Sequence, residues 1–176
     1  IEFRKIRVHK NIWHEGALHA PSVQLSNLYS YKVTGGYYDR SIWKLDSVDR
    51  YIAPENFILQ LIEQVGDRVE WNTPIKELPK ERPIISTIPM NKNLELVGVG
   101  LPEDIVFKHS PIRVQRFRIQ NSDVFQTVYY PSQDTSAYRA SVTGNLLIVE
   151  SVDDPRYPPV NLEEIFQSFG IHSYVE

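Results

Sequence analysis

The chain has 176 residues, of which 41% are hydrophobic and 23% are charged, and its formal net charge is −3. These values are typical of a globular protein that buries a substantial core, and the acidic balance argues against a nucleic-acid partner. The absence of cysteine excludes disulfides, thiolate metal ligands and a cysteine nucleophile. No apolar run approaches the roughly 18 residues that span a bilayer, so we expect a cytoplasmic protein without a membrane partner.

The chain begins at Ile1, and its only methionine is Met90. An initiator methionine is therefore either cleaved or present in sequence that precedes Ile1. We expect the second case, in which the protein has further N- and C-terminal segments. Residues 1–176 are predicted to form a single domain or part of one.

The first part of the chain is predicted to be mostly strand. Phe3–Val8 alternates apolar and basic side chains, which is typical of a strand with one solvated face, and the segment around Ala17–Leu25 is its expected partner. Leu28–Val33 is expected to form another strand, which the pair Gly35–Gly36 ends.

His9, His14 and His19 recur every five residues. This spacing places them on no common face of a helix or a strand. Metal ligands must converge on one point, so the sequence predicts surface or partly packed histidines and no metal site.

The middle of the chain is predicted to contain two helices. Residues 54 to about 65 begin with proline, repeat apolar side chains every three or four residues and end at Gly66, so they are expected to form a helix that packs on a sheet. Arg68–Trp71 is expected to be a short strand. Pro83–Ile88 is a β-branched run typical of a buried strand, and a short helix is expected near Asn91–Val97.

The segment from Pro111 to Glu150 is predicted to form most of a sheet. In Ile112–Ile119 the apolar residues change from even to odd positions, which predicts a β-bulge near Gln115–Arg116. Val124–Tyr130 is rich in β-branched and aromatic residues and is expected to be a second, antiparallel strand.

Two further strands complete this segment. Tyr138–Thr143 alternates, with Tyr138 on the core side and Arg139 on the polar side. Gly144–Asn145 suits a tight hairpin turn, after which Leu146–Val149 is expected to be a buried strand.

A final helix is expected to begin after Asn161. This residue suits the N-cap, Glu164 follows three positions later as in a capping box, and Gly170 is expected to end the helix. Taken together, these elements predict an α+β fold with a mixed or antiparallel sheet and a few packed helices.

The stretch from Tyr129 to Arg139 is the candidate ligand surface, because it concentrates aromatic rings and hydroxyls beside one arginine. Tyrosine offers a flat apolar body with a hydroxyl, and the arginine fork matches phosphate or carboxylate groups. The alternative is that Arg139, Ser141 and Thr143 only face water on an ordinary sheet. Lys108, Arg113, Arg116 and Arg118 form a basic cluster, which we interpret as a solvated strand face.

The same stretch, YYPSQDTSAYR at Tyr129–Arg139 followed by ASVT, resembles a pattern of UDP-galactopyranose mutases and related flavin-dependent proteins of the amine-oxidase type. The resemblance implies that Arg139, Tyr129 and Tyr138 bind an anionic or nucleotide-like substrate. In that family the arginine and a tyrosine ten residues earlier help to hold the substrate diphosphate, and Arg139 and Tyr129 have this spacing.

Two other segments carry the resemblance further. Lys80–Met90 is similar to the strand that returns from the substrate domain to the flavin domain, and Tyr37–Pro54 is similar to the start of the substrate-domain helix in phage-encoded relatives. The family's glycine-rich turn between a strand and a helix is absent from this sequence. The resemblance therefore implies the central substrate-binding portion of an oxidoreductase or sugar-nucleotide mutase whose FAD is bound by other segments of the protein.

Two hypotheses of other functional classes stay open. One is a stand-alone, non-enzymatic ligand-binding or interaction module. The other is a nucleic-acid-contacting sheet that uses Arg113, Arg116, Arg118 and the tyrosines, against which the acidic net charge argues. No general base or nucleophile can be assigned, because Asp39, Asp134 and Glu150 are candidates only by residue type.

Overall fold

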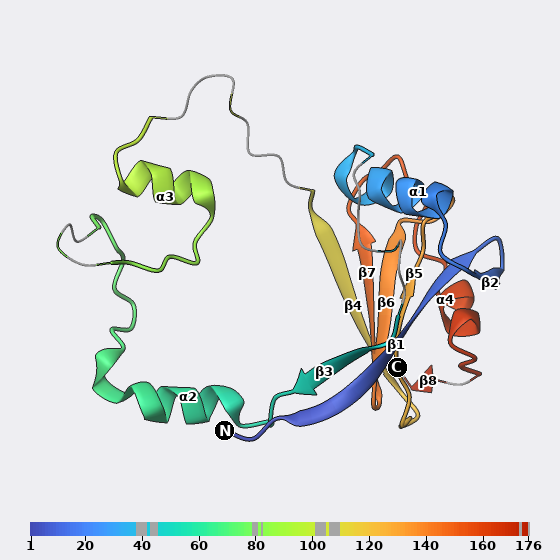
Figure 1. Cartoon of the computed structure of the whole chain (residues 1–176), viewed down its shortest axis with the longest axis horizontal. Coiled ribbons are helices and arrows are strands. Elements are labelled where there is room, and N and C mark those ends of the chain that lie inside the picture. Colours follow the sequence, from blue (N-terminus) through green and yellow to red (C-terminus); the bar gives the residue numbers. More distant parts are fainter. Residues whose placement is uncertain are drawn as a thin grey trace. The chain divides into compact units, whose positions relative to one another are not determined.

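The computed structural model describes residues 1–37, 42, 46–78, 81, 83–100, 105, 110–172 and 174–175 (Figure 1). Its contacts divide the chain into two compact units. Glu2–Pro54 and Ser110–Glu176 form the first, here called the sheet unit, and Glu55–His109 with Ile1 form the second, the helical unit. Asp39 and Lys108, named above as candidates, lie outside the described residues.

An eight-stranded mixed sheet forms the centre of the sheet unit, which confirms the predicted α+β class. The strand order is β2-β1-β5-β6-β7-β4-β8, with β3 also paired to β1, and Figure 1 shows β4, β7, β6, β5 and β1 side by side. Among the described strands only β1 and β5 run parallel. The strands are β1 Arg4–His14, β2 Ala17–His19, β3 Val48–Ile52, β4 Ile112–Ile119, β5 Phe125–Tyr129, β6 Ala137–Thr143, β7 Leu146–Val152 and β8 Tyr174–Val175.

Two helices pack on opposite faces of this sheet. Helix α4, Leu162–Ser168, contributes Ile165 and Phe166 to one core. Helix α1, Val23–Thr34, contributes Leu25 and Tyr29 to the other. Consecutive residues of β1 belong to different cores, Ile12 to that of α1 and Trp13 to that of α4. Because side chains alternate along a strand, this assigns every residue of the sheet to an α1 face or an α4 face.

The prediction of a strand at Leu28–Val33 is wrong, because these residues lie in α1. The Ser22 hydroxyl caps the helix by accepting a hydrogen bond from the Leu25 backbone NH, and Gly35 ends it with a positive φ of 71°. Leu25, Tyr29 and Lys32, three and four residues apart, form its buried side. The alternating aromatic residues of LYSYKV are typical of a strand, but the two caps and the spacing of the buried residues favour a helix.

Two predictions about strand pairing are also wrong. No register shift interrupts the pairing of β4 with β7, so there is no bulge near Gln115–Arg116. Instead β4 lies near the sheet edge, where Ile112 and Val114 remain exposed. Strand β5 does not pair with β4: it pairs with β6 and, in parallel, with β1. The Gly144–Asn145 turn between β6 and β7 is confirmed, with φ of 62° at Gly144.

The helical unit contains α2, Phe57–Val65, a 3₁₀ turn at Gly66–Arg68 and α3, Met90–Leu96, which confirms the two predicted helices. None of the described residues of α2 is buried. The predicted strands at Arg68–Trp71 and Pro83–Ile88 are wrong, and Ile85 is 95% exposed. A strand needs a partner for its backbone groups, and no described segment pairs with either run. No helix among the described residues is both long and apolar enough to cross a membrane.

The N-cap of α4 is confirmed, because the Asn161 side chain accepts hydrogen bonds from the Glu163 and Glu164 backbone NH groups. The Glu164 carboxylate does not complete a capping box: it accepts a hydrogen bond of 2.9 Å from the Trp13 indole. Helix α4 is thereby fixed both at its cap and against β1.

Replacing Asn161 with alanine is expected to lower the free energy of unfolding by about 1 kcal/mol, because two backbone donors lose their acceptor. Urea denaturation followed by circular dichroism measures this change. Gln167→Ala, at an exposed position of the same helix, is the matched control and should change stability by no more than a few tenths of a kcal/mol. Equal stability of N161A and the wild type would contradict the role given to the cap.

Candidate functional site

A β-bulge in β6 brings the predicted site residues onto one face of the sheet. The pairing of β6 with β7 shifts register between Ala137 and Arg139. Alternation would place Tyr138 and Arg139 on opposite faces, as the sequence predicted. The extra residue instead leaves Ala137 and Ala140 in the α4 core, while Tyr138 lies in the α1 core and Arg139 on the same face as Tyr138.

Arg139 makes a two-pronged ion pair with Glu150, its neighbour on β7. Its Nη2 donates to Glu150 Oε1 at 2.7 Å, and its Nε donates to Oε2. The hydrogen-bonded Glu150 carboxylate raises the pKa of Arg139, so the guanidinium stays charged. The Arg139 side chain is 40% exposed and that of Glu150 only 16%. Because the two opposite charges cancel, the ion pair has no net charge. Nη1 of Arg139 has no partner among the described residues and can still donate a hydrogen bond.

Three tyrosines surround this ion pair. Tyr29 from α1 packs edge to face on Tyr129, with ring centroids 5.4 Å apart, and its ring lies 6.4 Å from that of Tyr138. The Tyr138 hydroxyl donates to Glu150 at 3.4 Å, and the Arg139 guanidinium lies 5.8 Å from the Tyr138 ring. Burial raises the pKa of all three phenols, so they are hydrogen-bond donors at neutral pH.

The structure thus brings Tyr129, Tyr138 and Arg139 together and adds two residues that the sequence did not assign. Tyr29 was missed because its segment was expected to be a strand. Glu150 was named only by residue type, and no sequence signal marked it as the partner of Arg139. The five residues are called the tyrosine–arginine cluster below.

Lys32 supports the loop that carries the cluster. Its side chain leaves α1 and is only 4% exposed. Its Nζ donates to the carbonyls of Tyr130, Ser132 and Ala137 at 3.0, 2.5 and 2.6 Å. Burial lowers the pKa of Lys32 to about 7, and the negative charges of Asp134 and Glu164 oppose this shift. Lys32 therefore fixes both ends of the loop between β5 and β6.

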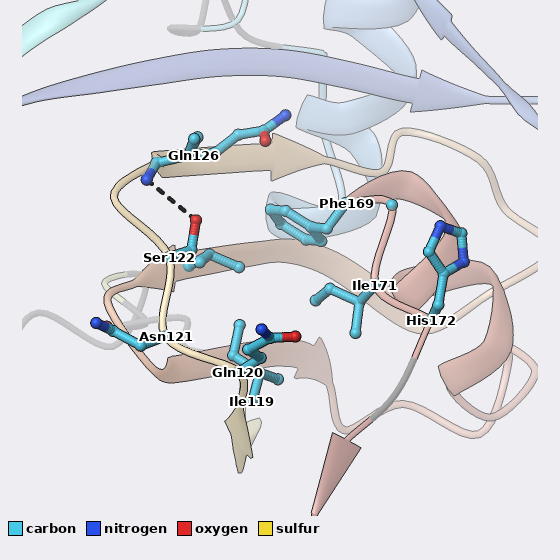
Figure 2. Close-up of a pocket in the computed structure, with 11 residues that line it drawn as sticks. Ile119, Gln120, Asn121, Ser122, Gln126, Phe169, Ile171 and His172 are labelled. Atoms are coloured by element: carbon cyan, nitrogen blue, oxygen red, sulfur yellow. Dashed lines mark hydrogen bonds between the residues drawn. The ribbon is translucent and has the colours of Figure 1, made fainter.

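A separate pocket of about 380 Å³ lies on the α4 side, between the turn after β4 and the segment after α4. Figure 2 shows Gln120, Asn121 and Ser122 on one side of it and Phe169, Ile171 and His172 on the other. The Ser122 hydroxyl is held by the Val124 backbone NH at 3.1 Å. The lining of this pocket includes no carboxylate, lysine or arginine. This pocket contains none of the predicted site residues.

The three histidines predicted to be surface or partly packed residues lie on β1 and β2. Pairing of β1 with β2 places His14 and His19, which lie on different strands, on one face of the sheet, with ring centroids 5.7 Å apart. The spacing prediction concerned a single helix or strand and did not include this pairing between strands. His9, at an odd position of β1, lies on the other face. Within the described part of the chain, no three histidine, aspartate or glutamate side chains gather as metal ligands would.

The described residues do not fit a flavin dinucleotide. Such a cofactor is bound where a strand passes through a glycine-rich turn into a helix. The three described connections from a strand to a helix, Ala20–Ser22, Ala53–Asn56 and Asp153–Asn161, contain no glycine.

Comparison with known proteins gives no independent identification: no protein-family model, no curated protein and no solved structure matches this chain.

Proposed function

We propose that this chain is the substrate-binding portion of a flavin-dependent oxidoreductase or sugar-nucleotide mutase that acts on an anionic or nucleotide-like substrate. The observation that carries the proposal is the bulge in β6. It places Arg139 beside Tyr138 and Tyr129 on one sheet face, whereas regular alternation would separate them. A bulge that re-aims a side chain in this way is frequent next to functional sites.

The chemistry of the tyrosine–arginine cluster suits binding and orientation of a substrate. Nη1 of the half-buried Arg139 and the phenol groups are donors, and tyrosine rings offer a surface for a sugar or base. Glu150 and Lys32 position these groups: Glu150 holds the guanidinium at two points, and Lys32 holds the loop. No proton-transfer or covalent step is assigned to these residues.

The proposal places FAD on residues other than those described, because the described strands and helices do not provide its site. The flavin would perform the redox or isomerisation chemistry, and this chain would present the substrate to it. Redox chemistry and isomerisation remain two forms of the same proposal.

The visible absorption spectrum of the complete protein, purified from its natural source, tests this proposal. A flavin band near about 450 nm that decreases when the substrate or dithionite is added would support it. A colourless protein with full affinity for its ligand would contradict the flavin-dependent reading.

A stand-alone binding module is the second candidate, and one observation favours it. The sheet unit has a hydrophobic core on each face, built from its own residues. Such a unit is expected to fold without a cofactor. The two candidates differ in the spectrum, whereas both require that the tyrosine–arginine cluster binds a ligand.

A further inference from the structure

Basic side chains on the two faces of the sheet differ in whether they are paired. On the α4 face, Lys5 and Arg7 both bind Asp49, and Arg113 binds Asp153 at 2.8 Å. On the α1 face, the strands carry Arg4, Lys10, Arg50, Arg116, Arg118 and Arg139, whose positions follow from the strand register. Of these six, only Arg139 makes an ion pair with a described residue.

The α1 face therefore carries a net positive charge although the chain as a whole is negative. Glu150 is the only acidic residue that the described strands place on this face, and Arg139 neutralises it. A surface with uncompensated charge of one sign attracts ligands of the other sign. The uncompensated positive charge therefore belongs to the other five basic residues of this face, because Glu150 compensates the charge of Arg139.

The strand register aligns part of this charge with two hydroxyl groups. Lys10 pairs with Thr127, Thr127 with Ser141, Ser141 with Ile148, and Ile148 with Arg116. These five side chains form one row across β1, β5, β6, β7 and β4, called the hydroxyl row below. Its neighbour toward α1 is the row that contains Tyr129, Arg139 and Glu150.

The centre of the hydroxyl row is built to make hydrogen bonds. The hydroxyls of Thr127 and Ser141 lie 3.2 Å apart, and either can donate to the other. Since each hydroxyl has one proton and two lone pairs, the pair retains one proton for an outside acceptor. Neighbouring strands lie about 4.8 Å apart, so Lys10 and Arg116 each begin about 10 Å from Ser141, on either side. Long basic side chains can lean toward the centre from both sides.

We propose that the hydroxyl row is an anion-binding subsite for a small phosphorylated ligand of the nucleoside diphosphate class. Thr127 and Ser141 donate to phosphate oxygens, while Lys10 and Arg116 compensate the charge. Arg139 and the tyrosines then contact the part of the ligand nearer to α1. The assignment of the ligand class rests on the proposed function, whereas the anion subsite itself rests only on register and charge.

Titration of the 176-residue chain with inorganic pyrophosphate, followed by ¹⁵N NMR, tests the subsite. We expect the Thr127 and Ser141 amide signals to shift, and we expect Lys10→Gln and Arg116→Gln each to weaken binding about fivefold or more. Arg113→Gln is the matched control, because it removes the same charge from the same strand on the opposite face. It should change the affinity less than twofold.

Three results would overturn the inference. The first is an Arg113→Gln effect as large as that of Arg116→Gln, which would show a general charge effect. The second is the absence of shifts in the hydroxyl row. The third is tighter binding of a single-stranded oligonucleotide than of a nucleoside diphosphate, which would assign the surface to nucleic acid. Pyrophosphate binding to the row, together with a failure of UDP to contact the tyrosine–arginine cluster, would support the subsite and reject the proposed function.

Discussion

Replacing Lys32 with methionine is expected to lower the free energy of unfolding at pH 7 by about 3 kcal/mol. Methionine has nearly the same length but no proton to donate, so the carbonyls of Tyr130, Ser132 and Ala137 lose their shared donor. Two of these three contacts are fully buried, where water cannot replace the ammonium group. The loss of these bonds is expected to exceed the gain from removing a buried amine.

Urea denaturation of the wild type and K32M measures the change. Lys92→Met is the control, because Lys92 is exposed and its ion pair is with Glu95, one helical turn away. It should alter the free energy of unfolding by less than about 0.5 kcal/mol. Unchanged stability in K32M would show that the loop between β5 and β6 does not depend on this lysine.

The same lysine predicts a pH dependence. Its pKa is lowered from 10.5 to about 7 by burial, so between these values the folded state binds fewer protons than the unfolded state. The free energy of unfolding should therefore rise as the pH increases from 7 toward 9.5. The range ends there because burial raises the pKa of Tyr29 and Tyr130, whose ionisation would oppose folding at higher pH. The rise should be absent from K32M, and a rise of equal size in that variant would contradict this assignment.

Replacing Arg139 with glutamine is expected to weaken binding of UDP, used as a nucleotide probe, by at least about tenfold. The substitution removes the charge-assisted donor at Nη1 and frees Glu150 to repel a phosphate. Its amide can still donate to Glu150, which limits the disturbance of the sheet. Isothermal titration calorimetry measures the affinity, and the unfolding curve of the variant checks that its fold is retained.

Arg113→Gln again provides the control, because Arg113 is also an ion-paired arginine but lies on the α4 face. An affinity within twofold of the wild type is expected for it. If R139Q is folded and binds UDP as tightly as the wild type does, Arg139 is a structural residue and the proposed ligand surface is wrong.

Local sequence patterns were sufficient for much of the sheet. Alternation in Tyr138–Thr143 and the glycine after it predicted β6 and its turn, and the alternation holds from Arg139 to Thr143, whereas Tyr138 departs from it at the bulge. Asn161 likewise predicted the start of α4. Helix α1 was missed because its aromatic residues alternate as in a strand, although Ser22 and Gly35 were readable as caps. The pairing of β5 with β1 depends on residues more than 100 positions apart, which no local pattern encodes.

The candidate site was predictable in composition but not in geometry. Tyr129, Tyr138 and Arg139 could be named from residue chemistry and spacing. Their convergence depends on a bulge at Tyr138, and the residues there have no feature, such as a glycine, that marks it. The Arg139–Glu150 pair and the contribution of Tyr29 depend on tertiary packing. In Ile112–Ile119 the change of apolar residues from even to odd positions predicted a bulge that is absent. The reason is that β4, near the sheet edge, tolerates exposed apolar side chains on one face.

The most direct test of the proposed ligand surface is a titration of the ¹⁵N-labelled chain with UDP. We predict that the largest shifts occur at the amides of Tyr129, Tyr138 and Arg139, with smaller shifts in the hydroxyl row. Shifts confined to Gln120, Asn121 and Ser122 would assign binding to the pocket on the α4 side and contradict the proposed ligand surface. A spectrum unchanged at millimolar UDP would also contradict it.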